Sequence, residues 1–92
     1  MTEPCKIDEY GNKYWWLNGK FHREDGPAIE RADGYQAWYL NGKAHREDGP
    51  ALISISGFKS WWLNDKFIAE GERPKNWDEL VLLSQVEQVM ND

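Results

Sequence analysis

Hydrophobic and polar residues follow one pattern that recurs along the chain. Two aromatic residues, a leucine, an asparagine and a lysine begin this pattern at Trp15, Trp38 and Trp61, at an interval of 23 residues. The same interval relates further sets of positions: Pro4/Pro27/Pro50, Gly11/Gly34/Gly57, Leu17/Leu40/Leu63, Asn18/Asn41/Asn64 and Lys20/Lys43/Lys66. A fixed period of this length is typical of stacked repeats, in which each copy is one supersecondary unit. We therefore predict three β-repeats over residues 4–72, within a single domain of residues 1–92.

Each repeat is predicted to consist of short antiparallel strands joined by tight turns. In the middle copy, residues 27–31 begin with Pro27, which suits a strand start, and residues 35–40 are rich in aromatic residues, so both segments are expected to be extended. The dipeptide Asn41-Gly42 predicts a type I′ hairpin turn, because both of its central residues tolerate positive φ. Residues 43–46 then form the returning strand. The predicted fold class is mainly β, with one C-terminal α-helix.

The hairpin turn also sets the register of the strands. In the first repeat it places Leu17 opposite Lys20 and Trp16 opposite Phe21. Because side chains alternate between the faces of a strand, the positions divide into two sets, which a register error of one residue would exchange. The apolar set is predicted to form the core: Trp15/Leu17/His22, Trp38/Leu40/His45 and Trp61/Leu63/Ile68. The mixed set is predicted to touch a partner: Tyr14/Trp16/Phe21/Arg23, Ala37/Tyr39/Ala44/Arg46 and Ser60/Trp62/Phe67/Ala69.

A helical pattern begins after residue 75. Asn76 is a favourable N-cap and Glu79 suits the third helical position, so the segment 76–91 is expected to hold a helix from Trp77 to about Met90. Its apolar residues cover a broad side: Leu80, Leu82, Leu83, Val86, Val89 and Met90. We expect this helix to cap the last repeat, because stacked repeats need closed ends. The alternative is that part of the apolar side joins two copies in a homodimer.

Composition narrows the possible functions. Six tryptophans supply apolar area to a small core or an interface. The net charge of −5 disfavours binding to nucleic acid or anionic lipid. Cys5 is the lone cysteine, so an internal disulfide is not expected and an intracellular location is favoured. The sequence shows no membrane span and no signal peptide at its start, which favours a cytoplasmic protein.

The string His-Arg-Glu-Asp-Gly-Pro-Ala at residues 22–28 and 45–51 carries the candidate chemistry. His22 and His45 are interpreted as structural, because the third copy has Ile68 at the matching position. Two histidines and one cysteine match no recognised zinc pattern, and no nucleophile motif or phosphate-binding loop is present in the sequence. We therefore expect neither an enzyme nor a metal or cofactor site.

The acidic and basic residues of the same string have different predicted roles. Asp25 and Asp48 are expected to form turns and to accept hydrogen bonds from backbone donors or from the arginine two positions earlier. Arg23 and Arg46 are consistent with two roles: stacking on a neighbouring ring, or binding a partner's carboxylate or phosphate. The predicted contact residues, chosen because aromatic residues and arginine dominate binding hot spots, are Tyr14, Trp16, Arg23, Tyr39, Arg46 and Trp62.

The repeats resemble a known family. The string that carries the resemblance is Trp38-Tyr39-Leu40-Asn41-Gly42-Lys43-Ala44-His45-Arg46-Glu47-Asp48-Gly49-Pro50-Ala51, with a close copy at residues 15–28. It resembles the variant MORN-like repeats of small bacterial and bacteriophage proteins, some of them labelled antitoxin-like. The chain departs from the ordinary MORN pattern in lacking its regular glycines, and the third copy has lost the HREDGPA string. The resemblance implies an antiparallel hairpin array with a groove used for binding.

Two functional hypotheses follow from the residues and the resemblance. The first is a phage-type inhibitor, a non-enzymatic protein that docks on a host defence enzyme or toxin in the host cytoplasm and blocks it. The second is a sequestering protein for a small nucleotide signal, in which aromatic rings stack on the base and Arg23 or Arg46 holds phosphate. A structural part of a virion is a more distant third.

Overall fold

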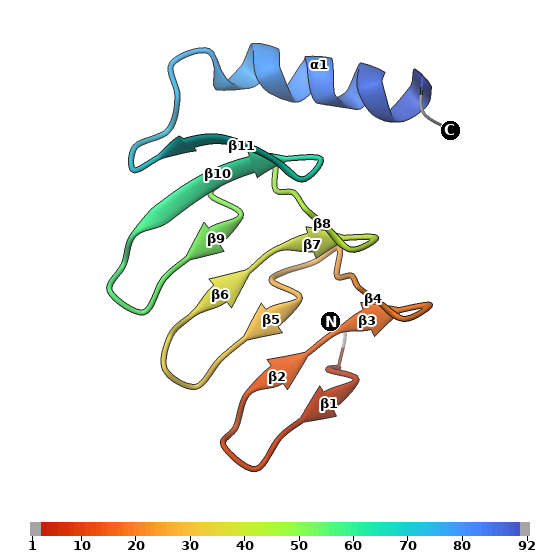
Figure 1. The fold of residues 1–92 in the computed structure, drawn as a ribbon, viewed down its shortest axis with the longest axis vertical. Helices are drawn as coiled ribbons and strands as arrows, with labels where there is room; N and C mark the ends of the chain where they lie inside the picture. The colour runs from red at the N-terminus through yellow and green to blue at the C-terminus, as the bar shows by residue number, and fades with distance from the viewer. Residues whose placement is uncertain (1–2, 91–92) are drawn as a thin grey trace.

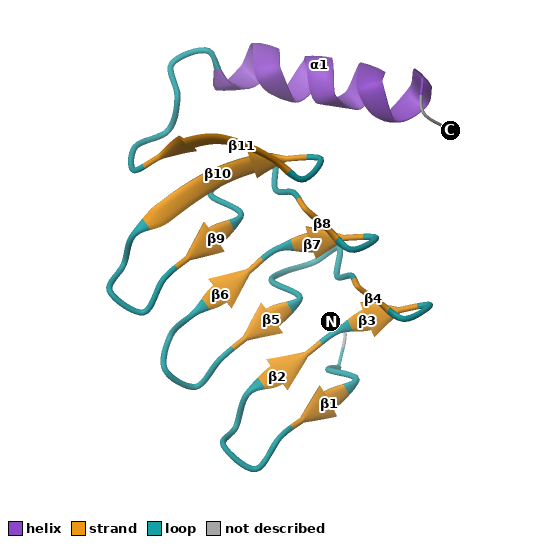
Figure 2. Ribbon diagram, viewed as in Figure 1, coloured by secondary structure: helices purple, strands orange, loops and turns teal. Residues whose placement is uncertain are grey.

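The computed structural model describes residues 3–90 and is mainly β, with antiparallel hairpins and one C-terminal helix (Figures 1 and 2). The strands are β1 (Lys6–Ile7), β2 (Lys13–Tyr14), β3 (Trp16–Leu17), β4 (Lys20–Phe21), β5 (Ile29–Glu30), β6 (Gln36–Ala37), β7 (Tyr39–Leu40), β8 (Lys43–Ala44), β9 (Leu52–Ile53), β10 (Lys59–Leu63) and β11 (Lys66–Glu70), and the helix is α1 (Trp77–Met90). This confirms the predicted mainly β class with antiparallel hairpins and one C-terminal helix. The predicted last residue of the helical segment, residue 91, lies outside the described residues.

The strands form one long antiparallel sheet and two small side hairpins. The sheet order is β1-β2-β5-β6-β9-β10-β11, while β3 pairs with β4 and β7 pairs with β8. Matching strands keep a constant interval: β1, β5 and β9 begin at Lys6, Ile29 and Leu52. Figure 1 shows the hairpins one above another along the long axis, with α1 across the end beyond β11. The array therefore has two edges, formed by the side hairpins and by the loops that join β1 to β2, β5 to β6 and β9 to β10.

Tryptophan interrupts the predicted long strands. Trp38 separates β6 from β7, because its N–H donates to the carbonyl of Ala51 at 2.7 Å while its own carbonyl accepts from His45 N at 3.2 Å. Trp15 separates β2 from β3 in the same way. Only β10 runs through its tryptophan, with a register shift between Trp61 and Trp62. The predicted strands 35–40 and 43–46 are therefore wrong in extent: β6 and β7 are separate, and β8 ends at residue 44.

The hairpin turns have the predicted conformation. Asn18 and Gly19 have φ of 53° and 78°, and Asn41 and Gly42 have the same values. Leu17 pairs with Lys20 and Trp16 with Phe21, which confirms the predicted register at the turn. The third turn has a non-glycine residue, Asp65, at φ 69°. Two hydrogen bonds to Ala44 hold it: its N–H donates to the carbonyl at 2.8 Å, and its Oδ1 accepts from the N–H at 3.2 Å.

Each histidine joins its hairpin to the next one. Nδ1 of His22 accepts a hydrogen bond from the backbone N–H of Asn41 at 2.9 Å, and Nδ1 of His45 accepts from Asn64 N at the same distance. Ile68, at the third position, has no further turn to bind and packs instead beside the helix. These contacts agree with the structural role predicted for the histidines, and they explain why an apolar residue ends the series.

The helix covers the last hairpin and encloses the main core. Trp61, Leu63 and Trp77 form a buried cluster, and Ile68, Leu80 and Val81 pack against it. The rings of Trp61 and Trp77 meet edge to face, with centroids 4.9 Å apart, a favourable geometry for aromatic pairs. The helix thus closes one end of the array. Within residues 3–90, no helix is both long and apolar enough to cross a membrane.

Asp8 organises the turn between β1 and β2. Its Oδ1 accepts from the backbone N–H groups of Tyr10 and Asn12, both at 3.0 Å, and its Oδ2 accepts from Asn12 Nδ2 at 3.0 Å and Tyr14 OH at 3.2 Å. Partial desolvation acts to raise the pKa of Asp8, but the hydrogen bonds from Asn12, Tyr10 and Tyr14 together outweigh it and hold the pKa below the usual 3.8.

Replacing Asp8 by asparagine is expected to lower stability in a pH-dependent way. Because the folded-state pKa is lowered, the charged group stabilises the fold above pH 3.8 and loses this effect as the pH falls through the folded value. Urea unfolding should therefore separate the wild type from Asp8→Asn at neutral pH and bring their midpoints together well below pH 3.8. A constant separation across this range would contradict the assignment.

Replacing His45 by leucine is expected to cost about 1–3 kcal/mol of unfolding free energy, because the half-buried Asn64 N–H loses its acceptor. His22→Leu should cost less, since the Asn41 N–H is exposed. His45→Asn is the control, because its amide oxygen can take the place of Nδ1 and should recover part of the loss. Urea unfolding measures all three variants, and equal values for His45→Leu and His45→Asn would refute the role of the hydrogen bond.

Candidate functional site

Each arginine of the HREDGP string stacks on the tryptophan of its own hairpin. Arg46 Cζ lies 3.9 Å from the ring centroid of Trp38, its Nε donates to Asp48 Oδ1 at 3.0 Å, and one of its terminal nitrogens donates to the carbonyl of Pro50 at 3.0 Å. Arg23 repeats this arrangement on Trp15, at 3.8 Å from the centroid. The guanidinium groups are therefore part of the folded loops.

The face predicted for the arginines is wrong. Alternation along an unbroken strand would place Arg23 beside Tyr14 and Trp16, but the chain leaves the strand after β4 and turns the side chain toward Trp15. Leu17, predicted to be in the core, is half exposed at 51%. The hydrogen bonds predicted from each arginine to the aspartate two positions later are confirmed: Arg23 to Asp25 at 2.8 Å and Arg46 to Asp48 at 3.0 Å.

Glycine makes room for the stacked guanidinium. A Cβ at Gly49 would lie 2.6 Å from Arg46 Cζ, and a Cβ at Gly26 would lie 2.8 Å from Arg23 Cζ. Distances of this size require the neighbouring group to move. The recurrence of glycine in the string is thus explained by close packing, whereas the sequence pattern alone suggested only a turn.

Replacing Gly49 by alanine is expected to cost about 1–3 kcal/mol of unfolding free energy, because the new methyl group overpacks the loop and displaces Arg46 from Trp38. Arg46→Ala removes the obstructing group, so adding Gly49→Ala to that variant should cost much less. A double-mutant cycle measured by urea unfolding gives the coupling between the two residues. Additive losses would show that the contact between residues 46 and 49 is unimportant.

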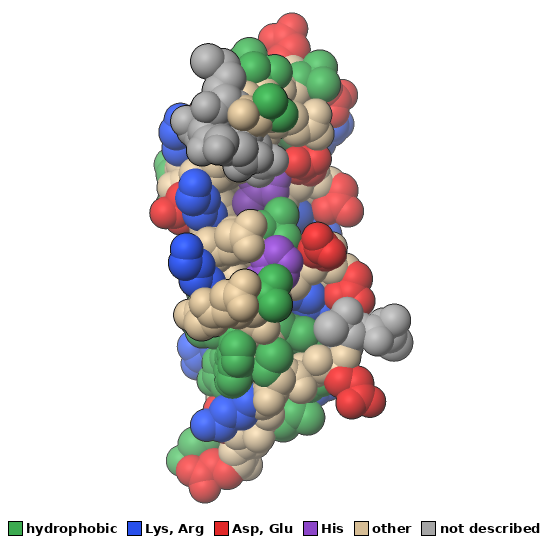
Figure 3. Space-filling model, turned by 90° about the vertical axis from the view of Figure 1, so that its right-hand side faces the viewer, with side chains coloured by type: hydrophobic (Ala, Val, Ile, Leu, Met, Phe, Trp, Pro, Cys, Tyr) green, Lys and Arg blue, Asp and Glu red, His purple; other side chains and the backbone are tan. Residues whose placement is uncertain are grey.

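A groove runs beside these loops at the edge formed by the side hairpins. Its larger part is a cavity of about 810 Å³ whose lining includes Trp38, Leu40, His45, Glu24 and Glu47. A smaller cavity of about 350 Å³ is lined by the matching residues of the first hairpin, among them Trp15, Leu17 and His22. In Figure 3 this edge faces the viewer: basic side chains lie mainly along one margin, acidic ones mainly along the other, and the histidines lie between them.

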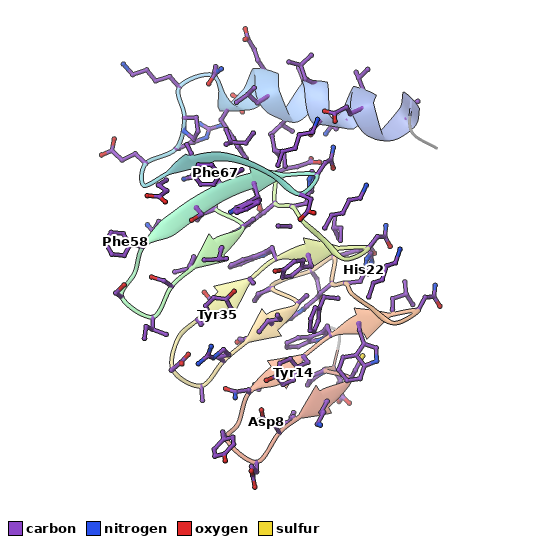
Figure 4. The ribbon with its side chains drawn as sticks, viewed as in Figure 1. Asp8, Tyr14, His22, Tyr35, Phe58 and Phe67 are labelled. Carbon is purple, nitrogen blue, oxygen red and sulfur yellow. The ribbon has the colours of Figure 1, made fainter. Side chains whose placement is uncertain are left out.

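A row of aromatic rings follows another face of the array. Tyr14 and Phe21 have centroids 6.4 Å apart, and Phe21 and Tyr39 have centroids 5.8 Å apart. Trp62 and Phe67 pair edge to face at 5.5 Å near the capped end. Figure 4 shows Tyr14 and Phe67 toward opposite ends of the array. The predicted contact residues Tyr14, Tyr39 and Trp62 therefore belong to this row.

The rings differ in their exposure. Trp16, Phe21 and Phe67 are 42%, 37% and 51% exposed, whereas Tyr14, Tyr39 and Trp62 are half-buried. Burial raises the pKa of Tyr39 above 10.0. In the part of the chain that the structure describes, the buried Nε1–H of Trp62 meets no hydrogen-bond acceptor. Phe67 is more exposed than Trp62, the ring with which it pairs. Side-chain alternation predicted that Phe67 lies on this face, but Phe67 was not among the predicted contact residues.

The outer side of α1 is a second apolar surface. Leu82, Leu83, Val86 and Val89 are between 55% and 75% exposed. Leu82, Val86 and Val89 follow the spacing of one helix face. The predicted homodimer through this helix stays a prediction.

The described residues include no group of three or more histidine, cysteine, aspartate or glutamate side chains that could hold a metal ion. His45 is 4% exposed, and both of its ring nitrogens are engaged: Nδ1 by Asn64 N, and Nε2 by Glu47 Oε2 at 2.9 Å. The site therefore offers aromatic surface, carboxylates and fixed guanidinium groups. Such groups can bind a partner through apolar contacts and hydrogen bonds.

No family model, curated protein or solved structure matches this chain.

Proposed function

We propose that this protein is a non-enzymatic binding protein, a phage-type inhibitor that docks on a host defence enzyme or toxin through its row of aromatic rings. The single observation that carries the proposal is the partial exposure of Phe21 and Phe67 in this row and of Trp16, which pairs with Phe21 across the β3–β4 hairpin. Aromatic residues bury large areas with few rotatable bonds and are frequent at binding hot spots. The direction toward a phage product comes from the resemblance of the repeats alone.

We also propose that the array consists of three MORN-like repeats of 23 residues. The constant interval between β1, β5 and β9 supports this division, as do the three turns with positive φ at Asn18, Asn41 and Asn64. In this scheme the repeats form a scaffold of constant geometry. The aromatic residues that differ between copies supply the specificity for a partner.

The contacts favour a protein partner over a small nucleotide. A nucleotide would need a cation for its phosphate, but Arg23 and Arg46 are already held by Asp25 and Asp48. The groove beside them also carries Glu24 and Glu47, which repel phosphate. The sequestering hypothesis is therefore the less supported of the two.

Alanine at Trp16 or Phe67 is expected to weaken partner binding by about 30-fold, which corresponds to the roughly 2 kcal/mol of a hot-spot residue. The tagged protein would first be incubated with lysate of the bacterial host, and the retained protein identified by mass spectrometry. The affinity of that purified protein for each variant would then be measured by titration.

Tyr10→Ala is the matched control for these variants, because Tyr10 is 73% exposed but belongs to the turn between β1 and β2. Its affinity should equal that of the wild type, and all variants should keep the same urea midpoint. If Trp16→Ala and Phe67→Ala bind the partner as tightly as Tyr10→Ala does, the aromatic row is not the docking surface.

A further inference from the structure

The groove and the helix-covered core occupy equivalent places in successive hairpins. The helix packs over Trp61, Leu63 and Ile68, and Trp77 Nε1 donates to the carbonyl of Glu47. Moving each of these four contacted residues back by 23 positions gives residues that line the cavity of about 810 Å³: Trp38, Leu40, His45 and Glu24. A further step back gives Trp15, Leu17 and His22, which line the cavity of about 350 Å³.

Among the described residues, the helix therefore fills the position at Trp61, whereas cavities lie at the equivalent positions beside Trp38 and Trp15. In the filled position Trp77 is 1% exposed, its ring meets Trp61 edge to face, and its Nε1 lies 2.7 Å from the Glu47 carbonyl oxygen. Gln85 Nε2 adds a bond to Glu47 Oε1 at 3.0 Å. The molecule itself thus shows what this kind of position accepts: an aromatic ring whose polar edge donates to the loop carbonyl.

The position at Trp38 differs from the filled one in the residue that lies over the tryptophan ring. Arg46 covers the Trp38 ring, whereas Ala69, 23 positions later, leaves the Trp61 ring free for Trp77. A ring that enters the Trp38 groove would therefore meet the guanidinium plane as well as the indole. Guanidinium groups stack readily on aromatic rings, so the exchange keeps the site suitable for an aromatic occupant.

The charge of the groove indicates which residues of a partner it would attract. The lining of the larger cavity includes four acidic residues, Glu24, Asp25, Glu47 and Asp48, against the two arginines. Asp25 and Asp48 keep 41% and 88% of their side-chain surface exposed. A basic residue next to the inserted ring would be attracted to this margin.

We propose that the groove at Trp38 binds a segment of a protein partner that inserts a tryptophan or tyrosine side chain next to a lysine or arginine. The inserted ring takes the role that Trp77 has at the third hairpin, and its N–H or O–H donates to the Glu24 carbonyl. This inference rests on the proposed protein-binding function and names a second subsite for it, distinct from the aromatic row.

The test uses the intact protein and a synthetic peptide that copies residues 73–87, with Asp78→Lys and Glu79→Lys introduced to supply basic residues beside Trp77. Calorimetric titration should show binding that weakens at least about tenfold when the peptide tryptophan is replaced by alanine. In the protein, Glu24→Lys should weaken binding at least about fivefold and reduce its sensitivity to salt.

Glu9→Lys is the matched control, because Glu9 is also exposed and acidic but lies in the turn between β1 and β2. This variant should bind the peptide as the wild type does. Binding that ignores the peptide tryptophan, or that responds equally to Glu24→Lys and Glu9→Lys, overturns the proposal. Displacement of the peptide by a nucleotide also overturns it and assigns the groove to a small anion.

The two proposals fail in different ways. If the peptide does not bind but the retained host protein still depends on Trp16 and Phe67, the groove proposal is wrong and the proposed function stands. If the peptide binds at Glu24 while no host protein depends on the aromatic row, the groove is supported and the docking surface assigned to the row is wrong.

Discussion

The fold depends on hydrogen bonds that pass from each hairpin to the next. Most strands here are two residues long, and an isolated hairpin of that size is at best marginally stable in water. The bond from Asn41 N to His22 Nδ1, and that from Asn64 N to His45 Nδ1, tie each turn to the hairpin before it. Backbone bonds beside them, such as Gly42 N to the Phe21 carbonyl at 2.8 Å, strengthen the same joints. The stability of each hairpin therefore depends on its bonds to the neighbouring hairpin.

The same dependence explains the changes at the last hairpin. In the described residues no further hairpin turn follows it, so an imidazole acceptor at position 68 would have no matching Asn N–H to bind, and isoleucine is found there. The arginine that covers the earlier tryptophans is replaced by Ala69, which leaves the Trp61 ring for Trp77. The helix in this way covers Trp61, Leu63 and Ile68, whereas the matching residues of the first two hairpins line the groove. The residues that differ at the last hairpin, Ile68 and Ala69, are thus accounted for by the helix that covers it.

The two surfaces to which functions are proposed lie outside this internal bonding. The aromatic row is only partly covered, and the groove beside Trp38 lacks the ring that Trp77 brings to the last hairpin. The arginines that looked suited to a ligand are instead held by Asp25 and Asp48.

The sequence by itself determined the local structure: the turns at Asn18-Gly19 and Asn41-Gly42, the pairing next to them and the helix from Trp77. These features depend on neighbours within a few residues, through positive φ at a turn, side-chain alternation and helix capping. Only the tertiary structure decided the strand breaks at Trp15 and Trp38 and the stacking of the arginines on those rings. It also decided that the position covered by α1 at Trp61 is equivalent to the groove at Trp38. Each of these involves a hydrogen bond or a ring contact with a residue in the next hairpin or beyond the strand end, and alternation along one strand carries no information about such partners.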